Sequence, residues 1–366
     1  MSDNPLILLA AGGTGGHLFP AEALGVELMK RGYRVRLATD ARALRYSGLF
    51  SRDTIDVVPS ETVRSRNPLS LARTGFTLAA GMIVALNLVR RLKPAVVVGF
   101  GGYPTLPPLL AASLLRVPSV IHDANAVLGR ANRFLASRVS AIATSLPGVL
   151  DRDPALASKA TTVGMPMRPA IVAAAAVKYA TPEVNGPLRL LVTGGSQGAR
   201  VMADIVPGAI EKLDPSLWIR LSLTQQVREE DMTRVRAVYD RLKINAELAP
   251  FFNDLPARLA SNHLVISRSG AGTVSELAAI GRPSILVPLP GAIDQDQFAN
   301  AGVLSEAGGA LRIAQSEFTP ERLASEISAL AADPAKLANM AKAAGNAGRL
   351  DAAERLADLV AKVAGI

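Results

Sequence analysis

The chain has 366 residues, 49% of them apolar and 19% charged, which suggests two domains because one core seldom serves so long a chain. It contains no cysteine, which excludes disulfide bonds, thiolate metal sites and a cysteine nucleophile. The formal net charge of +9 favours anionic partners such as nucleotides, pyrophosphates or phospholipid surfaces, whereas an aromatic content of 4% and the lack of a dense basic run argue against nucleic acid.

The first half of the chain alternates short apolar runs with longer amphipathic stretches. Residues 6–10 form a continuous apolar run that ends in glycines, and a helical pattern follows as far as the Arg31-Gly32 stop. Further strands are expected at 34–39, 55–59, 95–100 and 118–122. Because the segments between them are long enough for crossover helices, the pattern predicts an α/β fold with a mostly parallel, doubly wound sheet.

The same pattern restarts in the second half, after VGMPMRP (163–169) and a linker near 177–189. The stretch LRLLVTGGSQGAR (188–200) again predicts a strand, a glycine-rich turn and a helix. Later strands are expected at 218–223, 263–268 and 284–288, and the C-terminal region has helical periodicity. We therefore expect a domain over 1–165 and another over 166–345, with a helix in 346–366 packing back on the first domain.

Four glycines fall within residues 12–16, and His17 follows them. The spacing is not the dinucleotide fingerprint, because position 18 is leucine, and it is not a P-loop, because no Gly-Lys-Ser/Thr follows. Glycines allow a close backbone approach, and the following helix offers free N–H groups to an anion or a sugar diphosphate. A ligand-free turn with His17 as an ordinary cap residue is the alternative; a general-base role requires a substrate hydroxyl within reach.

Three further loops follow predicted strands. The loop GFGGYPTLPP (99–108) suits a structural turn and a ligand loop equally well. Asn125, within 122–132, is placed to bond a sugar hydroxyl or amide, although a turn-forming role is the simpler interpretation. The stretch GGSQGA (194–199) repeats the glycine turn in the second half and places Ser196 to donate to a phosphate at a helix N-terminus.

The stretch SRSGAGTVSELAAIGRPSILVPLP (267–290) combines a helix with a strand. Thr273 and Glu276 are three residues apart and share a helix face. Glu276, expected in the first turn, either caps the helix or accepts hydrogen bonds from ribose hydroxyls, and spacing alone favours the cap. Gly281 is expected to end the helix, and residues 294–301 concentrate Asp and Gln where a sugar would be recognised.

No metal site or cofactor is predicted. His17, His122 and His263 are far apart in sequence, and the chain has no His-Glu-x-x-His motif. A Ser-His-Asp hydrolase would need a Gly-x-Ser-x-Gly elbow, which is missing.

Residues 74–89 carry no charge, whereas Arg73 precedes them and Arg90, Arg91 and Lys93 follow. A membrane span needs about 20 apolar residues, so this run is too short to cross a bilayer. It is either a crossover helix wholly within the core or a helix that buries one side in the fold and places the other on a bilayer surface, where the cations meet anionic headgroups.

The motifs GGTGGHLFPA, GFGGYPTLPP, IHDAN, VGMPMRP, TGGSQGAR and SRSGAGTVSELAAIGRPSILVPLP…DQDQFANA occur in this order over nearly the whole chain. Together they resemble the MurG-type family of bacterial peptidoglycan N-acetylglucosaminyltransferases. The resemblance implies a GT-B fold, with two Rossmann-like doubly wound domains whose parallel sheets face each other across a cleft. It implies inverting transfer of GlcNAc from UDP-GlcNAc to the MurNAc 4-hydroxyl of lipid I (undecaprenyl-pyrophosphoryl-MurNAc-pentapeptide), which yields lipid II.

The resemblance also implies a metal-free site and a peripheral protein at the cytoplasmic side of the cell inner membrane, on its anionic surface. His17 matches the candidate general base of the family, and Asn125 matches the asparagine that contacts GlcNAc. Arg168 matches the arginine on the donor diphosphate, and Glu276 matches the acid on the ribose. The UDP-GlcNAc site that the resemblance implies comprises Thr14, Gly15, Gly16, Asn125, Arg168, Ser196, Phe252, Arg268, Ala271, Gly272, Thr273, Val274, Ser275, Glu276 and Gln297.

The family usually has the motif His-Glu-Gln-Asn, and this chain has Asp123-Ala124 in place of its Glu-Gln. The chain also departs from the family pattern at Gly272, where a larger apolar residue is common, and at Asp296, which replaces a frequent Gln. Three alternatives stay open. One is a GT-B transferase with another acceptor. Another is a nicotinamide-dependent dehydrogenase, in which Asp40 would bind the ribose. The third is a lipid-surface binding module without activity.

Overall fold

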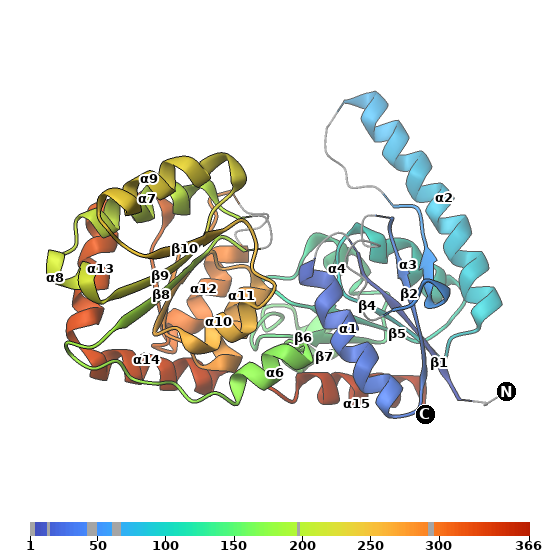
Figure 1. The fold of residues 1–366 in the computed structure, drawn as a ribbon. Coiled ribbons are helices and arrows are strands. Elements are labelled where there is room, and N and C mark those ends of the chain that lie inside the picture. Colours follow the sequence, from blue (N-terminus) through green and yellow to red (C-terminus); the bar gives the residue numbers. More distant parts are fainter. Residues whose placement is uncertain (1–3, 13–14, 42–49, 61–66, 196–197, 292–295) are drawn as a thin grey trace. The chain divides into compact units, whose positions relative to one another are not determined.

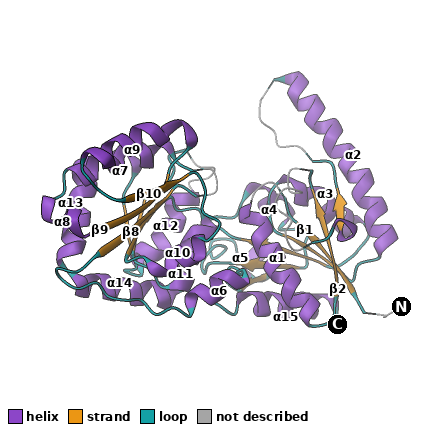
Figure 2. Ribbon diagram, in the orientation of Figure 1, coloured by secondary structure: helices purple, strands orange, loops and turns teal. Residues whose placement is uncertain are grey.

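The computed structural model describes residues 4–12, 15–41, 50–60, 67–195, 198–291 and 296–366, with the side chains of 68–74 left out (Figure 1). They form two compact units. The first comprises Met1–Arg168 together with Leu350–Ile366, and the second comprises Pro169–Arg349. Each unit is a parallel sheet with helices on both faces (Figure 2), as the βαβ pattern predicts.

The first unit has a seven-stranded sheet in the order β3-β2-β1-β4-β5-β6-β7, in which neighbouring strands are parallel. The order reverses between β1 and β4, and ligands of doubly wound sheets bind beyond the carboxyl ends of the strands at this switch point. Its strands are β1 Leu6–Ala10, β2 Arg34–Thr39, β3 Ile55–Val57, β4 Val96–Gly99, β5 Ser119–Asp123, β6 Ala141–Thr144 and β7 Ala160–Thr162.

Helices cover the two faces of this sheet with separate apolar cores. Its helices are α1 Gly15–Lys30, α2 Pro68–Leu92, α3 Leu106–Leu114, α4 Arg130–Leu135, α5 Pro154–Ala157 and α15 Ala352–Ala364. On one face, Leu356 and Val360 of α15 are fully buried with Leu24 and Leu28 of α1. The other face is covered by apolar residues of α2, α3 and α4. The last helix of the described chain therefore completes the core of the first unit.

The second unit has a six-stranded sheet in the order β10-β9-β8-β11-β12-β13, again with parallel neighbours. Its switch point lies between β8 and β11. Its strands are β8 Leu188–Thr193, β9 Leu221–Gln226, β10 Ala246–Ala249, β11 Leu264–Ser267, β12 Ser284–Leu286 and β13 Ala310–Arg312. Its helices are α6 Pro169–Ala175, α7 Arg200–Glu211, α8 Pro215–Arg220, α9 Met232–Arg241, α10 Leu255–Ser261, α11 Ala271–Ile280, α12 Asp296–Glu306, α13 Pro320–Ala332 and α14 Pro334–Ala347.

Two expectations from the sequence are wrong. Residues 218–220 end helix α8 instead of beginning a strand, because Asp214 caps that helix with its side chain and Pro215 begins it. The expectation that the uncharged run at 74–89 is too short to cross a bilayer is also wrong: it belongs to the 25-residue helix α2, whose window Gly75–Leu92 would be able to cross a membrane by length and composition alone. Of the two alternatives left open for this run, a helix wholly within the core does not fit, because only 22% of that window is buried.

Candidate functional site

The first turn of α1 and the loop after β4 meet at the switch point of the first sheet. His17 lies in that turn, against Gly101 and Gly102, whose φ angles are 86° and 78°. A Cβ added to Gly101 would lie 3.3 Å from Cδ2 and Nε2 of His17, and one added to Gly102 would lie 3.6 Å from its Nδ1. The glycine pair therefore adopts a backbone that other residues rarely adopt and leaves space for the imidazole.

Burial favours the neutral form of the His17 imidazole. The residue is half-buried as a whole, but its Nδ1 is buried and has no hydrogen-bond partner in the part of the chain that the structure describes. Burial lowers the pKa of His17, and the charge of Asp123 and the backbone of Gly12 oppose this shift without cancelling it. A histidine that is neutral at pH 7 can accept a proton from a substrate hydroxyl.

Asp123 ends strand β5 and organises the loop that carries Asn125. Its Oδ1 accepts from the backbone N–H of Asn125 at 3.0 Å, and its Oδ2 accepts from the N–H of Gly129 at 2.9 Å and from Asn132 Nδ2 at 2.9 Å. The aspartate that departs from the family pattern thus fixes the backbone at Asn125 directly. Asn132 also donates to the carbonyl of His122 at 3.1 Å. Sequence reasoning missed this role of Asn132, although the residue lies within the motif.

His122 and His263 have structural roles. Nε2 of His122 lies 3.1 Å from the carbonyl oxygen of Gly164, the imidazole packs 5.5 Å from the ring of Phe100, and burial lowers the pKa of His122. In the second unit, Nδ1 of His263 accepts from the N–H of Arg189 at 3.1 Å, and burial lowers the pKa of His263 to about 4. Within the described ranges, no group of three or more His, Asp or Glu residues is arranged to hold a metal ion.

Arg168 lies beside the start of α1. Its guanidinium stacks on the ring of Phe19 with 3.9 Å between its Cζ and the ring centroid. Phe19 in turn covers Gly15, where an added Cβ would lie 2.8 Å from the ring. Gly16 is exposed in the same turn. A cation and the N-terminus of a helix are thereby combined near His17, which favours an anionic ligand.

In the second unit, a glutamine at the end of β9 supports the glycine loop after β8. Oε1 of Gln226 accepts from Thr193 Oγ1 and from the N–H of Gly194, both at 2.9 Å, and its Nε2 donates to the carbonyl of Pro250 at 3.1 Å. A Cβ on Gly194 would lie 2.1 Å from the nitrogen of Ala199, so only glycine fits there. The only sequence signal for Gln226 is a polar residue at the end of a strand. Thr14 and Ser196 lie outside the described residues.

The N-cap residue of α11 provides no side-chain cap. It is Gly270, which has no side chain with which to bond the helix. Because the helix begins at Ala271, Glu276 lies in its second turn, and the expectation of a first-turn position is wrong. The glutamate is therefore too far along the helix for the capping role that spacing alone favoured. Gly281 ends the helix with a φ of 68°, as expected.

The side chains of this helix divide between its two faces. Val274 and Ser275 are buried, whereas Ala271, Gly272, Thr273 and Glu276 are half-buried. A Cβ added to Gly272 would have no neighbour within 4 Å. The half-buried face and the first-turn N–H groups, which Gly270 does not cap with a side chain, offer a surface for an anionic ligand at the switch point of the second sheet.

Arg268, Gln297 and Phe252 make contacts that hold the same edge of the second sheet together. Arg268 is buried and donates from Nη1 to the carbonyls of Val287 and Pro288, both at 3.1 Å. Oε1 of Gln297 accepts from the N–H of Leu289 at 3.1 Å. The ring of Phe252 is buried beneath a guanidinium, with Cζ of Arg258 4.3 Å from its centroid. Their observed side-chain contacts are structural, so any contact of Phe252 with a ligand would involve its backbone.

The sequence of this chain matches two domain descriptions. Residues 7–144 match the glycosyltransferase family 28 N-terminal domain, and residues 189–356 match the glycosyltransferase family 28 C-terminal domain. It is 80% identical to a protein of Bradyrhizobium sp. strain BTAi1 over 365 residues and 78% identical to one of Bradyrhizobium diazoefficiens over 366, with each chain fully covered. Both relatives carry the name UDP-N-acetylglucosamine–N-acetylmuramyl-(pentapeptide) pyrophosphoryl-undecaprenol N-acetylglucosamine transferase.

Solved structures resemble the whole chain. Acinetobacter baumannii MurG is 28% identical, with a TM-score of 0.79 and coverage of 98% of this chain and 99% of that one. The UDP-GlcNAc 2-epimerase of Neisseria meningitidis, solved bound to UDP-GlcNAc, is 13% identical with a TM-score of 0.68, over 98% of this chain and 99% of the epimerase. The second likeness concerns the fold alone. The two Rossmann-like units therefore form a GT-B fold, as the resemblance implied.

Replacement of Asp123 by asparagine is expected to lower the pKa of His17 further, because the change removes a negative charge that favours the imidazolium. In the parent protein, the imidazole of His17 should titrate below its ordinary pKa of about 6.5. NMR titration of the imidazole signals measures both values, and His17→Ala identifies the signal. Asp53→Asn is the control, because Asp53 does not contribute to the shift. A pKa that rises in Asp123→Asn would contradict the electrostatic role of Asp123.

Proposed function

We infer the activity of this chain from its family, because the chain belongs to glycosyltransferase family 28 and matches the two domains of that family in order. It transfers N-acetylglucosamine from UDP-GlcNAc to lipid I and forms lipid II for peptidoglycan synthesis. The observation that carries this conclusion is the identity of 78–80% to transferases of that name over the full length of each chain. The acceptor in the name of these relatives is a pyrophosphoryl-undecaprenol, which favours lipid I over another acceptor.

A dehydrogenase is not supported. Asp40, the residue that would have to bind a nicotinamide ribose, is only 4% exposed. Its Oδ2 lies 3.1 Å from the position that a Cβ on Gly12 would occupy, so the carboxylate is packed against the glycine loop. A ribose hydroxyl would have to displace this packing before it reached the carboxylate.

We propose that His17 is the general base that takes the proton of the MurNAc 4-hydroxyl as it attacks the anomeric carbon with inversion. Its neutral imidazole and its place at the switch point of the first sheet support this role. Asp123 acts through other groups: it holds the loop of Asn125 and raises the proton affinity of His17. Asn125 is the proposed contact for the GlcNAc group.

The departing UDP gains negative charge during the transfer. In the second unit, the N-terminus of α11 is the proposed site of the nucleotide, with Thr273 and Glu276 on its half-buried face. Glu276 accepts hydrogen bonds from the ribose hydroxyls in this proposal. Arg168 is the proposed cation for the diphosphate, since its charge would stabilise the leaving group without a metal.

We propose that the protein attaches to the anionic cytoplasmic surface of the inner membrane through α2. Phe76 and Ile83 lie seven residues apart on this helix and are 80% and 62% exposed. Arg90 and Lys93 are exposed at its C-terminal end and would meet lipid phosphates. Arg91 contributes less to this attraction, because it pairs with Asp56 at 3.0 Å.

Purified protein incubated with UDP-GlcNAc and a lipid I analogue is expected to form a GlcNAc-bearing lipid. His17→Ala should lower kcat about 10²- to 10⁴-fold, the range for loss of a general base, while UDP affinity stays near that of the parent. Product is measured by mass spectrometry and UDP affinity by calorimetry. If no product forms where an authentic enzyme succeeds, the transfer reaction is wrong; if folded His17→Ala loses UDP binding, His17 is a donor ligand.

Glu276→Ala is expected to weaken UDP binding about 10- to 100-fold, because a hydrogen bond to a charged group contributes about 1.5–3 kcal/mol. Isothermal calorimetry measures the dissociation constant. Glu306→Ala is the matched control, since Glu306 is exposed at the far end of the neighbouring helix α12. Unchanged UDP affinity in Glu276→Ala would assign the glutamate a structural role.

The double variant Phe76→Ser/Ile83→Ser is expected to bind anionic lipid vesicles more weakly than the parent, because it removes apolar surface from α2. Co-sedimentation with phosphatidylglycerol vesicles measures binding, and added salt should weaken binding of the parent by screening its cations. Ile219→Ser is the control, since Ile219 is 90% exposed on α8 of the second unit. Equal binding by the double variant and the parent would place the membrane contact elsewhere.

A further inference from the structure

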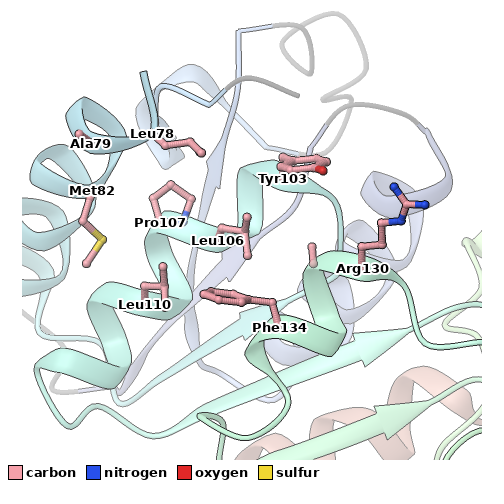
Figure 3. A pocket seen from close by; sticks show the side chains of 10 residues that line it. Leu78, Ala79, Met82, Tyr103, Leu106, Pro107, Leu110, Arg130 and Phe134 are labelled. Carbon is pink, nitrogen blue, oxygen red and sulfur yellow. The ribbon is translucent and has the colours of Figure 1, made fainter. Parts of the chain in front are cut away.

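A groove lies between α2, α3 and α4 in the first unit (Figure 3). It has a volume of about 500 Å³, which is within the usual range for sites of small molecules. It is lined by Leu78, Ala79, Met82, Tyr103, Leu106, Pro107, Leu110, Arg130, Ala131 and Phe134. No residue of this groove belongs to the donor site proposed above.

The lining of the groove is apolar along its length and polar at one end. All of its lining residues are apolar except Tyr103 and Arg130. In Figure 3, the guanidinium of Arg130 lies at the end away from Leu110 and Met82, and the hydroxyl of Tyr103 is directed toward the side of Arg130. A ligand that fits this distribution has an anionic head and a flexible hydrocarbon tail.

The polar end of the groove adjoins the proposed base through the chain itself. Tyr103 directly follows Gly101 and Gly102, the pair that packs against the imidazole of His17. Arg130 begins α4, whose Asn132 is bonded to Asp123. A sugar whose hydroxyl faced His17 would therefore have its anionic substituent near Tyr103 and Arg130.

We propose that this groove binds the first isoprene units of the acceptor's polyprenyl chain, with Arg130 and Tyr103 at the pyrophosphate. The inference rests on the proposed transfer to lipid I. In that acceptor the pyrophosphate links the sugar to the lipid. The proposed base, the polar end of the groove and its apolar length therefore follow one another in the same order as the sugar, the pyrophosphate and the lipid of the substrate. The bilayer is the less suitable occupant, because a membrane surface contacts outward-facing side chains such as Phe76, whereas a concave groove encloses a single chain.

The test compares two acceptors with the same MurNAc-pentapeptide pyrophosphate, one on a long polyprenyl chain and one on a single isoprene unit, in detergent micelles without bilayer. Leu110→Trp fills the groove from α3. Leu114→Trp is the matched control, since Leu114 is one turn further along α3, 68% exposed and outside the groove. Leu110→Trp should raise KM for the long-chain acceptor about tenfold, a cost of about 1.4 kcal/mol, and leave KM for the short-chain acceptor and for UDP-GlcNAc near parent values.

Ala79→Trp fills the groove from the opposite wall, on α2, and keeps the test decisive if Leu110→Trp does not fold. Thermal unfolding reports the fold of each variant.

Arg130→Ala should raise KM for both acceptors, because both carry the pyrophosphate, and Arg130→Lys should restore part of the affinity. If folded groove variants leave KM for the long-chain acceptor unchanged, or raise KM equally for both acceptors, the groove does not bind the polyprenyl chain. The proposed transfer reaction would not be affected by that result. Absence of transfer to either acceptor by the parent would overturn the proposed function as well.

Discussion

The contact between the imidazole of His17 and the glycine pair Gly101-Gly102 is the constraint on which the site in the first unit depends. It brings together two loops that are more than eighty residues apart in the chain. It exists because β1 and β4 are parallel neighbours, so their carboxyl ends lie on the same edge of the sheet. The same loop continues into Tyr103, which lines the groove, and then into α3, which packs in the core. One short segment of the chain therefore contacts the proposed base, the groove and the core.

Much of this arrangement was predictable from the sequence, because buried parallel strands form continuous apolar runs. Strands β1 and β2 have the predicted bounds, and the glycine loops lie at the two switch points. The strand expected at 218–223 was placed three residues early, since apolar residues of α8 run directly into β9. Strands β6, β7, β10 and β13 were not anticipated, because each has only three or four residues, too few to show a clear period.

The candidate site was less predictable than the fold, because its geometry depends on contacts that no spacing encodes. Glu276 was expected at the start of a helix whose first residue is set by Gly270, and the error of one turn removes the capping role that spacing alone favoured. Arg268 and Gln297 carry side chains typical of ligand binding, yet both hold neighbouring loops together. Conversely, Gln226 and Asn132 were not singled out, although their amide groups fix the loop after β8 and the loop after β5.

The return of α15 to the first unit has a consequence for the order in which the protein matures on the ribosome. Leu356 and Val360 fill the core beneath α1, yet they are synthesised after the whole of the second unit. A nascent chain that has not reached residue 352 thus exposes the part of α1 that α15 covers, while the second unit, whose core is built from its own residues, is already able to fold. The unit made first is therefore finished last, because the face of its sheet that α1 covers is completed only once translation is nearly complete.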